Sequence, residues 1–153
     1  MPLLTHFCLV AGTGTDSHAI SSFDSALLDA GLGNYNLVRV SSILPPNCTQ
    51  RNEVLLPGGS VLFIAYATLT THADELIASA IAVAIPRNAE QCGVIMEYSN
   101  RTSKKDAVKT ARELAENAMR KRHIAVDTIL SSGIEIQGKD TVFSTTFAGI
   151  SMF

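Results

Sequence analysis

The pattern of apolar and polar residues along the chain predicts six or seven strands and two helices. Strands are expected at residues 6–12, 36–44, 60–68, 78–85, 93–98, 124–137 and 141–151. Apolar residues spaced three and four apart predict a helix that is capped by Asp16 or Ser17 and ends near Ala30. The same spacing predicts a second, longer helix over residues 103–122. Too many strands lie between the helices for repeated βαβ units, so we expect one α+β domain over residues 1–153, with helices outside the sheets.

Glycines are expected to form several of the turns. Gly12-Thr13-Gly14 follows the first strand and predicts a turn; a Gly-x-Gly alone does not make a phosphate-binding fingerprint. Gly31 is placed to end the first helix in a left-handed conformation. Gly138-Lys139-Asp140 predicts a turn that joins the last two strands as an adjoining hairpin.

Residues 76–85 are ambiguous between helix and strand. Their alanine content favours a helix, whereas the alternation of Ile81, Val83 and Ile85 before Pro86 favours a strand. We predict a strand over residues 78–85.

One carboxylate falls on the apolar stripe of the first predicted helix. Asp24 lies among the apolar residues of that stripe, Ile20, Phe23, Leu27 and Leu28. Two interpretations stay open. Asp24 can sit at the edge of the stripe and reach solvent or an arginine such as Arg39, or it can bind a cationic group of a ligand.

A second carboxylate, Glu97, interrupts the apolar strand predicted at 93–98. Glu97 shares a face with Ile95. Desolvation at such a position favours the protonated carboxyl group, which suits a proton donor. The alternative is a glutamate at the surface edge of the strand, so the pattern again supports two interpretations.

Composition and charge exclude several classes of partner. Hydrophobic residues make up 46% of the chain and charged residues 17%, which favours burial against other subunits. The net charge is −2, and the basic residues of 101–122 alternate with acidic ones, so we expect no nucleic-acid binding. No apolar segment reaches the roughly 18 residues of a membrane span, and no signal peptide is evident, so we expect no membrane association.

The cysteines and histidines show no ligand or disulfide spacing. Cys8, Cys48 and Cys92 are odd in number and about forty residues apart, which predicts free thiols and a reducing, cytoplasmic setting. The four histidines show no metal-site spacing, so we expect no metal.

Two adjacent serines, Ser41 and Ser42, come near the end of the strand predicted at 36–44, before Pro45 and Pro46. Taken alone, such a pair is polar filler near a turn. The surrounding string Asn36-Leu37-Val38-Arg39-Val40-Ser41-Ser42-Ile43-Leu44-Pro45-Pro46, however, resembles the pyruvoyl-dependent arginine decarboxylase family. Further segments resemble the family in the same order across about 7–150: residues 23–28, 33–35, 80–86, 92–98 and the helix that starts at Ser103.

The resemblance implies that the chain cleaves itself between Ser41 and Ser42. The Ser42 hydroxyl would attack the preceding carbonyl to form an ester, elimination would leave a dehydroalanine, and loss of ammonia would give a pyruvoyl group. The products would be a β chain of residues 1–41 and an α chain of residues 42–153. The resulting covalent cofactor forms a Schiff base with the substrate amine, so neither pyridoxal phosphate nor a metal is expected.

The resemblance also gives roles to the misplaced carboxylates in the decarboxylation of L-arginine to agmatine and carbon dioxide. Glu97 would reprotonate the carbanion, Asp24 would bind the arginine guanidinium, and Asn36 would bind substrate or assist cleavage. Two alternatives stay open: a pyruvoyl decarboxylase that acts on another amino acid, and a binding module of the same fold that is not cleaved.

The family fold implies a four-layer αββα sandwich that forms trimers, or dimers of trimers, with sites at the subunit interfaces. Residues 1–5, 47–57 and 151–153 carry no signature of the family, so no role is predicted for them.

Overall fold

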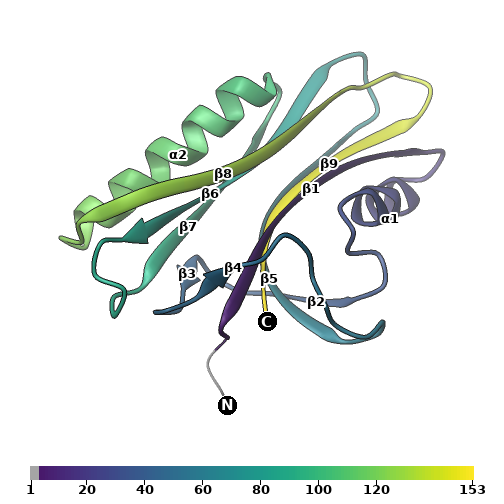
Figure 1. Cartoon of the computed structure of the whole chain (residues 1–153). Coiled ribbons are helices and arrows are strands. Elements are labelled where there is room, and N and C mark those ends of the chain that lie inside the picture. Colours follow the sequence, from purple (N-terminus) through teal and green to yellow (C-terminus); the bar gives the residue numbers. More distant parts are fainter. Residues whose placement is uncertain (1–3) are drawn as a thin grey trace.

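Nine strands and two helices make up the described part of the chain, residues 4–153, in the computed structural model (Figure 1). In chain order they are β1 (His6–Asp16), α1 (Ala19–Asp29), β2 (Asn36–Arg39), β3 (Ile43–Leu44), β4 (Thr49–Gln50), β5 (Val61–Thr71), β6 (Leu76–Pro86), β7 (Gly93–Asn100), α2 (Lys104–Lys121), β8 (Val126–Gln137) and β9 (Phe143–Met152). A five-stranded sheet has the order β2-β5-β9-β1-β4, and a four-stranded sheet has the order β3-β7-β6-β8. The predicted α+β class is confirmed.

Three buried clusters define how the helices and sheets are layered. The first joins α2 to the four-stranded sheet, and the second fills the space between the two sheets. The third joins α1 to the outer face of the five-stranded sheet through residues that include Ala26, Leu62 and Phe147. Figure 1 shows α1 and α2 on opposite sides of the strands. The order helix, sheet, sheet, helix agrees with the predicted sandwich.

The alternation that predicted β6 has a direct structural reason. Ala80, Ala82 and Ala84 face α2 and contact its own row of buried alanines, which lets helix and sheet approach closely. The larger side chains of Ile81 and Val83 point the other way, into the space between the sheets. The strand prediction is confirmed and extended to Leu76–Pro86.

The turn predicted at Gly12-Thr13-Gly14 is wrong, because β1 continues through both glycines to Asp16. Helix α1 crosses directly over them. A Cβ at Gly12 would lie 2.5 Å from the carbonyl oxygen of Ala26, and a Cβ at Gly14 would lie 2.2 Å from that of Ser22. The glycines are therefore required by close packing of helix on strand.

The hairpin predicted at Gly138-Lys139-Asp140 is also wrong. β8 pairs with β6 in the four-stranded sheet, whereas β9 pairs with β1 and β5 in the other sheet. The connection therefore crosses between the sheets, and β9 becomes an almost fully buried central strand. Turn residues alone do not distinguish such a crossing from a hairpin.

The helix ends are mostly as predicted. Ser103 caps α2, since its Oγ accepts a hydrogen bond from the backbone N–H of Asp106 at 3.1 Å. Gly31 follows α1 with φ of 77°, as expected for a left-handed C-terminal glycine. The start of α1 was predicted too early, because β1 occupies Asp16 and His18 is the N-cap.

Segments without a predicted role contribute to the five-stranded sheet and its edge. Within 47–57, the short strand β4 pairs with the start of β1. The backbone of Phe153 exchanges hydrogen bonds with that of His6, so the end of the chain closes against β1. Residues 1–3 lie outside the described part of the chain.

Neither α1 nor α2 combines the length and the apolar character of a bilayer-spanning helix.

Candidate functional site

The single strand predicted over 36–44 is wrong: the chain forms two short strands in different sheets. β2 pairs in parallel with β5 in the five-stranded sheet, and β3 pairs with β7 in the four-stranded sheet. The N–H of Val40 donates to the Ile64 carbonyl, and the N–H of Ile95 donates to the Ser42 carbonyl at 2.8 Å. The bond between Ser41 and Ser42 is thus the link through which the chain leaves one sheet and enters the other.

A tight turn surrounds this bond. The carbonyl oxygen of Ser41 accepts a hydrogen bond from the N–H of Ile43 at 3.0 Å. A bond between residues two apart is a γ-turn, and Ser42 at its centre is not among the residues with positive φ, so the turn is of the common inverse type. The N–H of Ile43 therefore points at the carbonyl that the predicted cleavage would attack. Ser41 is exposed and Ser42 is partly buried.

Glu97 lies on the strand that receives Ser42. The N–H of Ile95 donates to the Ser42 carbonyl. Glu97 lies two residues further along the same face of β7, about 7 Å from Ile95. The side chain of Glu97 is 29% exposed, and its Oε2 is buried without a hydrogen-bond partner in the described residues. Desolvation raises the pKa of Glu97, and the charge and hydrogen bond of Arg39 partly oppose this rise.

Arg39 connects β2 to Glu97 across the two sheets. Its Nη2 donates to Glu97 Oε1 at 3.4 Å and to the Tyr66 carbonyl at 3.0 Å. The guanidinium carbon also lies 4.6 Å from the centre of the Tyr66 ring. Sequence reasoning had offered Arg39 as a partner for Asp24; in the structure it pairs with Glu97.

A cavity of about 220 Å³ opens beside this pair. Its lining residues come from β2, β5 and β7: Arg39, Ala67, Thr68, Glu97, Tyr98 and Ser99. Ser42 lies outside the lining. One chain brings Ser42, Glu97 and Arg39 into the same region, where Glu97 Oε2 has no hydrogen-bond partner from residues 4–153.

Asp24 reaches solvent in the structure, as the first of its two interpretations allowed, because the apolar stripe around it is itself only partly buried. Ser22 and Ala26 are the buried residues of α1, whereas Asp24 is exposed and shares its face with Ile20 and Leu28, which are 75% and 57% exposed. Within residues 4–153, no hydrogen bond or ion pair engages the Asp24 carboxylate. The small residues of α1 are buried because the helix lies so close to the glycines of β1 that larger side chains do not fit.

Asn36 lies at the far end of β2 from Ser42. Residues 36–40 run extended along β5, which places Asn36 about 13 Å from Val40. The Asn36 Nδ2 donates to the Gly59 carbonyl at 2.8 Å. Neither Asp24 nor Asn36 is brought to the Ser41-Ser42 bond of its own chain.

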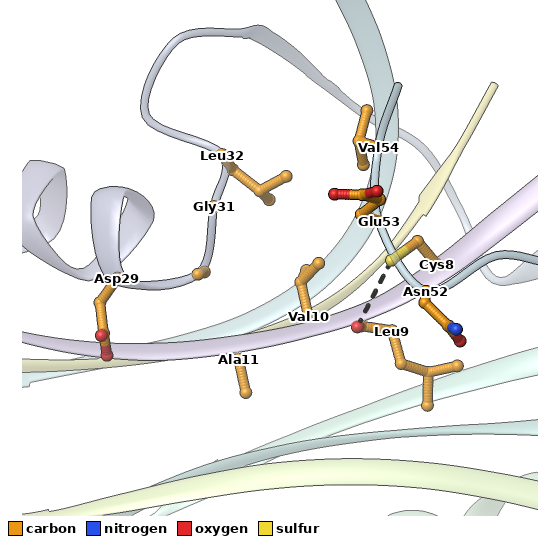
Figure 2. Close-up of a pocket in the computed structure, with 11 residues that line it drawn as sticks. Cys8, Leu9, Val10, Ala11, Asp29, Gly31, Leu32, Asn52, Glu53 and Val54 are labelled. Atoms are coloured by element: carbon orange, nitrogen blue, oxygen red, sulfur yellow. Dashed lines mark hydrogen bonds between the residues drawn. The ribbon is translucent and has the colours of Figure 1, made fainter. Parts of the chain in front are cut away.

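A separate cavity of about 400 Å³ lies between β1, the end of α1 and the loop at 52–54 (Figure 2). Figure 2 shows the carboxylates of Asp29 and Glu53 on its two sides and the side chain of Cys8 between the strand and the loop. The Cys8 thiol donates to the Leu9 carbonyl at 3.6 Å, and burial raises its pKa. The catalytic residues expected from the sequence do not line this cavity.

Two features of the Ser42 region were missed by sequence reasoning. The N–H of Ile43 is a backbone group, and no residue type marks its direction. The pairing of Arg39 with Glu97 joins two strands through residues that are 58 positions apart in sequence.

Among residues 4–153, no group of three or more His, Cys, Asp or Glu side chains could hold a metal ion.

Comparison with known proteins shows which proteins the chain is similar to. Residues 6–150 match the family model described as pyruvoyl-dependent arginine decarboxylase. The chain is 42% identical over 128 residues to the pyruvoyl-dependent arginine decarboxylase of Methanocaldococcus jannaschii, covering 83% of this chain and 78% of that protein. It is 41% identical over 128 residues to the enzyme of the same name from Methanococcus vannielii, with the same coverage. Pyruvoyl-dependent arginine decarboxylase 2 of Methanosarcina mazei is 44% identical over 95 residues, which cover 59% of this chain and 52% of that protein.

Proposed function

This chain belongs to the pyruvoyl-dependent arginine decarboxylase family, and we propose that it cleaves itself between Ser41 and Ser42 and then converts L-arginine to agmatine and carbon dioxide. The observation that carries the proposal is the position of that bond, at the link between two sheets and beside the half-buried Glu97. The names of its relatives give the substrate and the cofactor.

The turn at Ser42 supports the cleavage step. The Ser42 hydroxyl is the internal nucleophile, and the Ser41 carbonyl is polarised by the N–H of Ile43 at 3.0 Å. A donor at this distance stabilises negative charge as it develops on the oxygen. The bond lies outside both strands, because neither β2 nor β3 includes Ser41 or Ser42.

Cleavage would leave the fold intact. The fragment of residues 1–41 contains β1, α1 and β2, and β1 alone pairs with β9 through ten successive residues. α1 also packs against Leu62 and Phe147, which belong to the other fragment. The two fragments are therefore expected to stay associated as one protomer.

The surroundings of Ser42 fit a pyruvoyl group. This group supplies a ketone that condenses with the substrate amine and accepts the electron pair released with carbon dioxide. Glu97 has the properties of the proton donor that the carbon then needs: a raised pKa caused by desolvation, and a buried Oε2 that has no partner among the described residues. In its protonated form, Glu97 would supply this proton after carbon dioxide has left.

Asp24 and Asn36 are proposed to act on the Ser42 region of a neighbouring subunit. Each lies away from Ser42 in its own chain. The exposed apolar side chains of Ile20 and Leu28 flank Asp24, and those of Val38 and Ile43 lie on the segment around the serines. Burial of these two apolar surfaces against each other in a trimer would bring the Asp24 carboxylate to the substrate guanidinium. Trimers can pair further into hexamers. The three unpaired cysteines suit a reducing, cytoplasmic setting.

Release of carbon dioxide from a panel of labelled amino acids tests the proposed activity. Arginine should be decarboxylated much faster than lysine, ornithine or histidine, because only the guanidinium group forms a bidentate ion pair with Asp24. Turnover of another amino acid in preference to arginine would make the chain a pyruvoyl decarboxylase of different specificity. Binding of arginine without turnover by an uncleaved chain would make it a binding module.

Mixed trimers test the shared site. Assayed at an arginine concentration well below the KM of D24N, the D24N and E97Q variants should each have strongly reduced activity alone. When the two chains are co-expressed in equal amounts, about one quarter of the sites should combine an intact Asp24 from one chain with an intact Glu97 from another. Recovery of activity to about that level supports the interface site. No recovery in trimers shown by mass to be mixed would place both residues in the same chain's site.

A further inference from the structure

Arg39 makes three contacts that fix its guanidinium beside the Glu97 carboxyl group. Its Nη2 bonds the Tyr66 carbonyl at 3.0 Å and Glu97 Oε1 at 3.4 Å, and the guanidinium stacks on the Tyr66 ring. A side chain held at the backbone and ring of one strand gives a fixed direction to a bond made with another. Cleavage after Ser41 would place Arg39 on one fragment and Glu97 on the other.

The two oxygens of Glu97 have different surroundings. Oε1 accepts from Arg39, whereas Oε2 is buried and has no hydrogen-bond partner among the described residues. A proton on Oε1 would face a cationic donor, so the protonated carboxyl group is expected to carry its hydrogen on Oε2. The contact with Arg39 thus selects the oxygen that can donate.

We infer that Arg39 is a positioning residue for Glu97. Arg39 holds Oε1 of Glu97 and leaves Oε2 to deliver the proton to the substrate carbon. The inference rests on the proposed role of Glu97 as proton donor. It adds a function for a residue on the cleaved-off fragment, since residues 1–41 would then supply part of the catalytic environment of the larger fragment.

Arg39 is the charged residue that faces Glu97 in the described part of the chain. Glu97 shares a face of β7 with Ile95, which packs between the sheets, so the charged residues of α2 lie beyond the opposite face. β6 places Ile81 opposite Glu97, and β5 contributes Ala67 and Thr68 to the cavity. The other ionisable group in the cavity lining is Tyr98.

Cleavage itself adds one more charge, the carboxylate of Ser41, two residues from Arg39. Every processed variant would carry this carboxylate, so its effect on the pKa of Glu97 is the same in all the variants compared. The charge of Arg39 lowers the pKa of Glu97 and so opposes the effect of desolvation. Without this charge, the pKa of Glu97 therefore rises further.

The test compares R39Q and R39K with the wild type in cleavage, kcat, KM and the pH dependence of kcat. R39Q should cleave and keep its KM, lose about tenfold in kcat from misplacement of the donor, and show its alkaline decline in activity at higher pH. R39K restores the positive charge but not the planar guanidinium group. Its pH profile should therefore return toward that of the wild type, while its kcat stays below the wild-type kcat.

Arg101 offers a matched control, because its Nε forms a 2.7 Å ion pair with Glu75 at the surface. R101Q should leave kcat and the pH profile unchanged. The inference on Arg39 is overturned if R39Q keeps the wild-type pH profile, if R39Q raises KM alone, as a ligand of the substrate carboxylate would, or if R39Q stays uncleaved.

E97Q measured in parallel separates this inference from the proposed function. Full turnover by E97Q would remove Glu97 from the mechanism, and the role of Arg39 with it. A slow E97Q together with an R39Q profile identical to that of the wild type would overturn only the role of Arg39.

Discussion

The rate of self-cleavage should depend on one backbone N–H. Replacement of Ile43 by proline removes the hydrogen that the Ser41 carbonyl accepts at 3.0 Å. The pairing of β3 with β7 does not use this N–H, because the ladder bond at this point runs from the Ile95 N–H to the Ser42 carbonyl. Removal of one such donor costs about 100- to 1,000-fold in rate, or about 2.7–4 kcal/mol of transition-state stabilisation.

The assay follows freshly translated precursor at fixed temperature and measures conversion to the fragments 1–41 and 42–153 on a denaturing gel. The half-time for I43P should be at least about 100 times that of the wild type. I43A is the matched control, since it keeps the N–H but loses the exposed Ile43 side chain, as I43P also does. Cleavage of I43P at the wild-type rate, or equal slowing in I43A, would refute the role of this donor.

Four further predictions concern the proposed site and the fold. E97Q should cleave largely as the wild type but lose about 100- to 10,000-fold in kcat, measured by carbon dioxide release. Because desolvation raises the Glu97 pKa and only the protonated carboxyl group donates, wild-type kcat should fall as pH rises through that pKa; an E97Q profile with the same decline would exclude Glu97 as its source. D24N should raise the KM for arginine about tenfold or more with little effect on cleavage, and an unchanged KM would remove Asp24 from the substrate site. G14A should lower the free energy of unfolding by about 1–3 kcal/mol in a denaturant titration, because its Cβ would lie 2.2 Å from the Ser22 carbonyl, whereas G58A, with its nearest neighbour at 4.0 Å, should be close to neutral.

The sequence predicted most elements because their periodicity reflects burial. The alanines of β6 and the larger residues between them face different layers, and the Ser103 cap and Gly31 mark helix ends by their own chemistry. Local pattern failed where a segment changes sheets. Residues 36–44 alternate as one strand does, yet the chain bends at the serines and pairs with a different sheet on each side.

The candidate site was predictable in its residue types and less so in its geometry. The pattern left Glu97 open between a desolvated proton donor and a glutamate at the surface edge of the strand, and in the structure its side chain is 29% exposed. The pattern also left Asp24 open between an edge position at solvent and a ligand-binding position; the glycines of β1 admit only the small face of α1, and Asp24 faces outward. The contact of Arg39 with Glu97 is not encoded by any local spacing, because it depends on how two sheets stack.

The mass of the purified protein reports whether the bond between Ser41 and Ser42 has been cleaved and whether the pyruvoyl group has formed. Two species are expected: residues 1–41, and residues 42–153 lighter by the mass of one ammonia than the same fragment with a free serine at its N-terminus. S42A should give one full-length species and still assemble, since the serine hydroxyl supplies the nucleophile and, once esterified, the leaving group whose elimination gives the dehydroalanine. A wild-type chain that keeps its full-length mass after warm incubation, or a cleaved fragment that retains an N-terminal serine, would contradict the account.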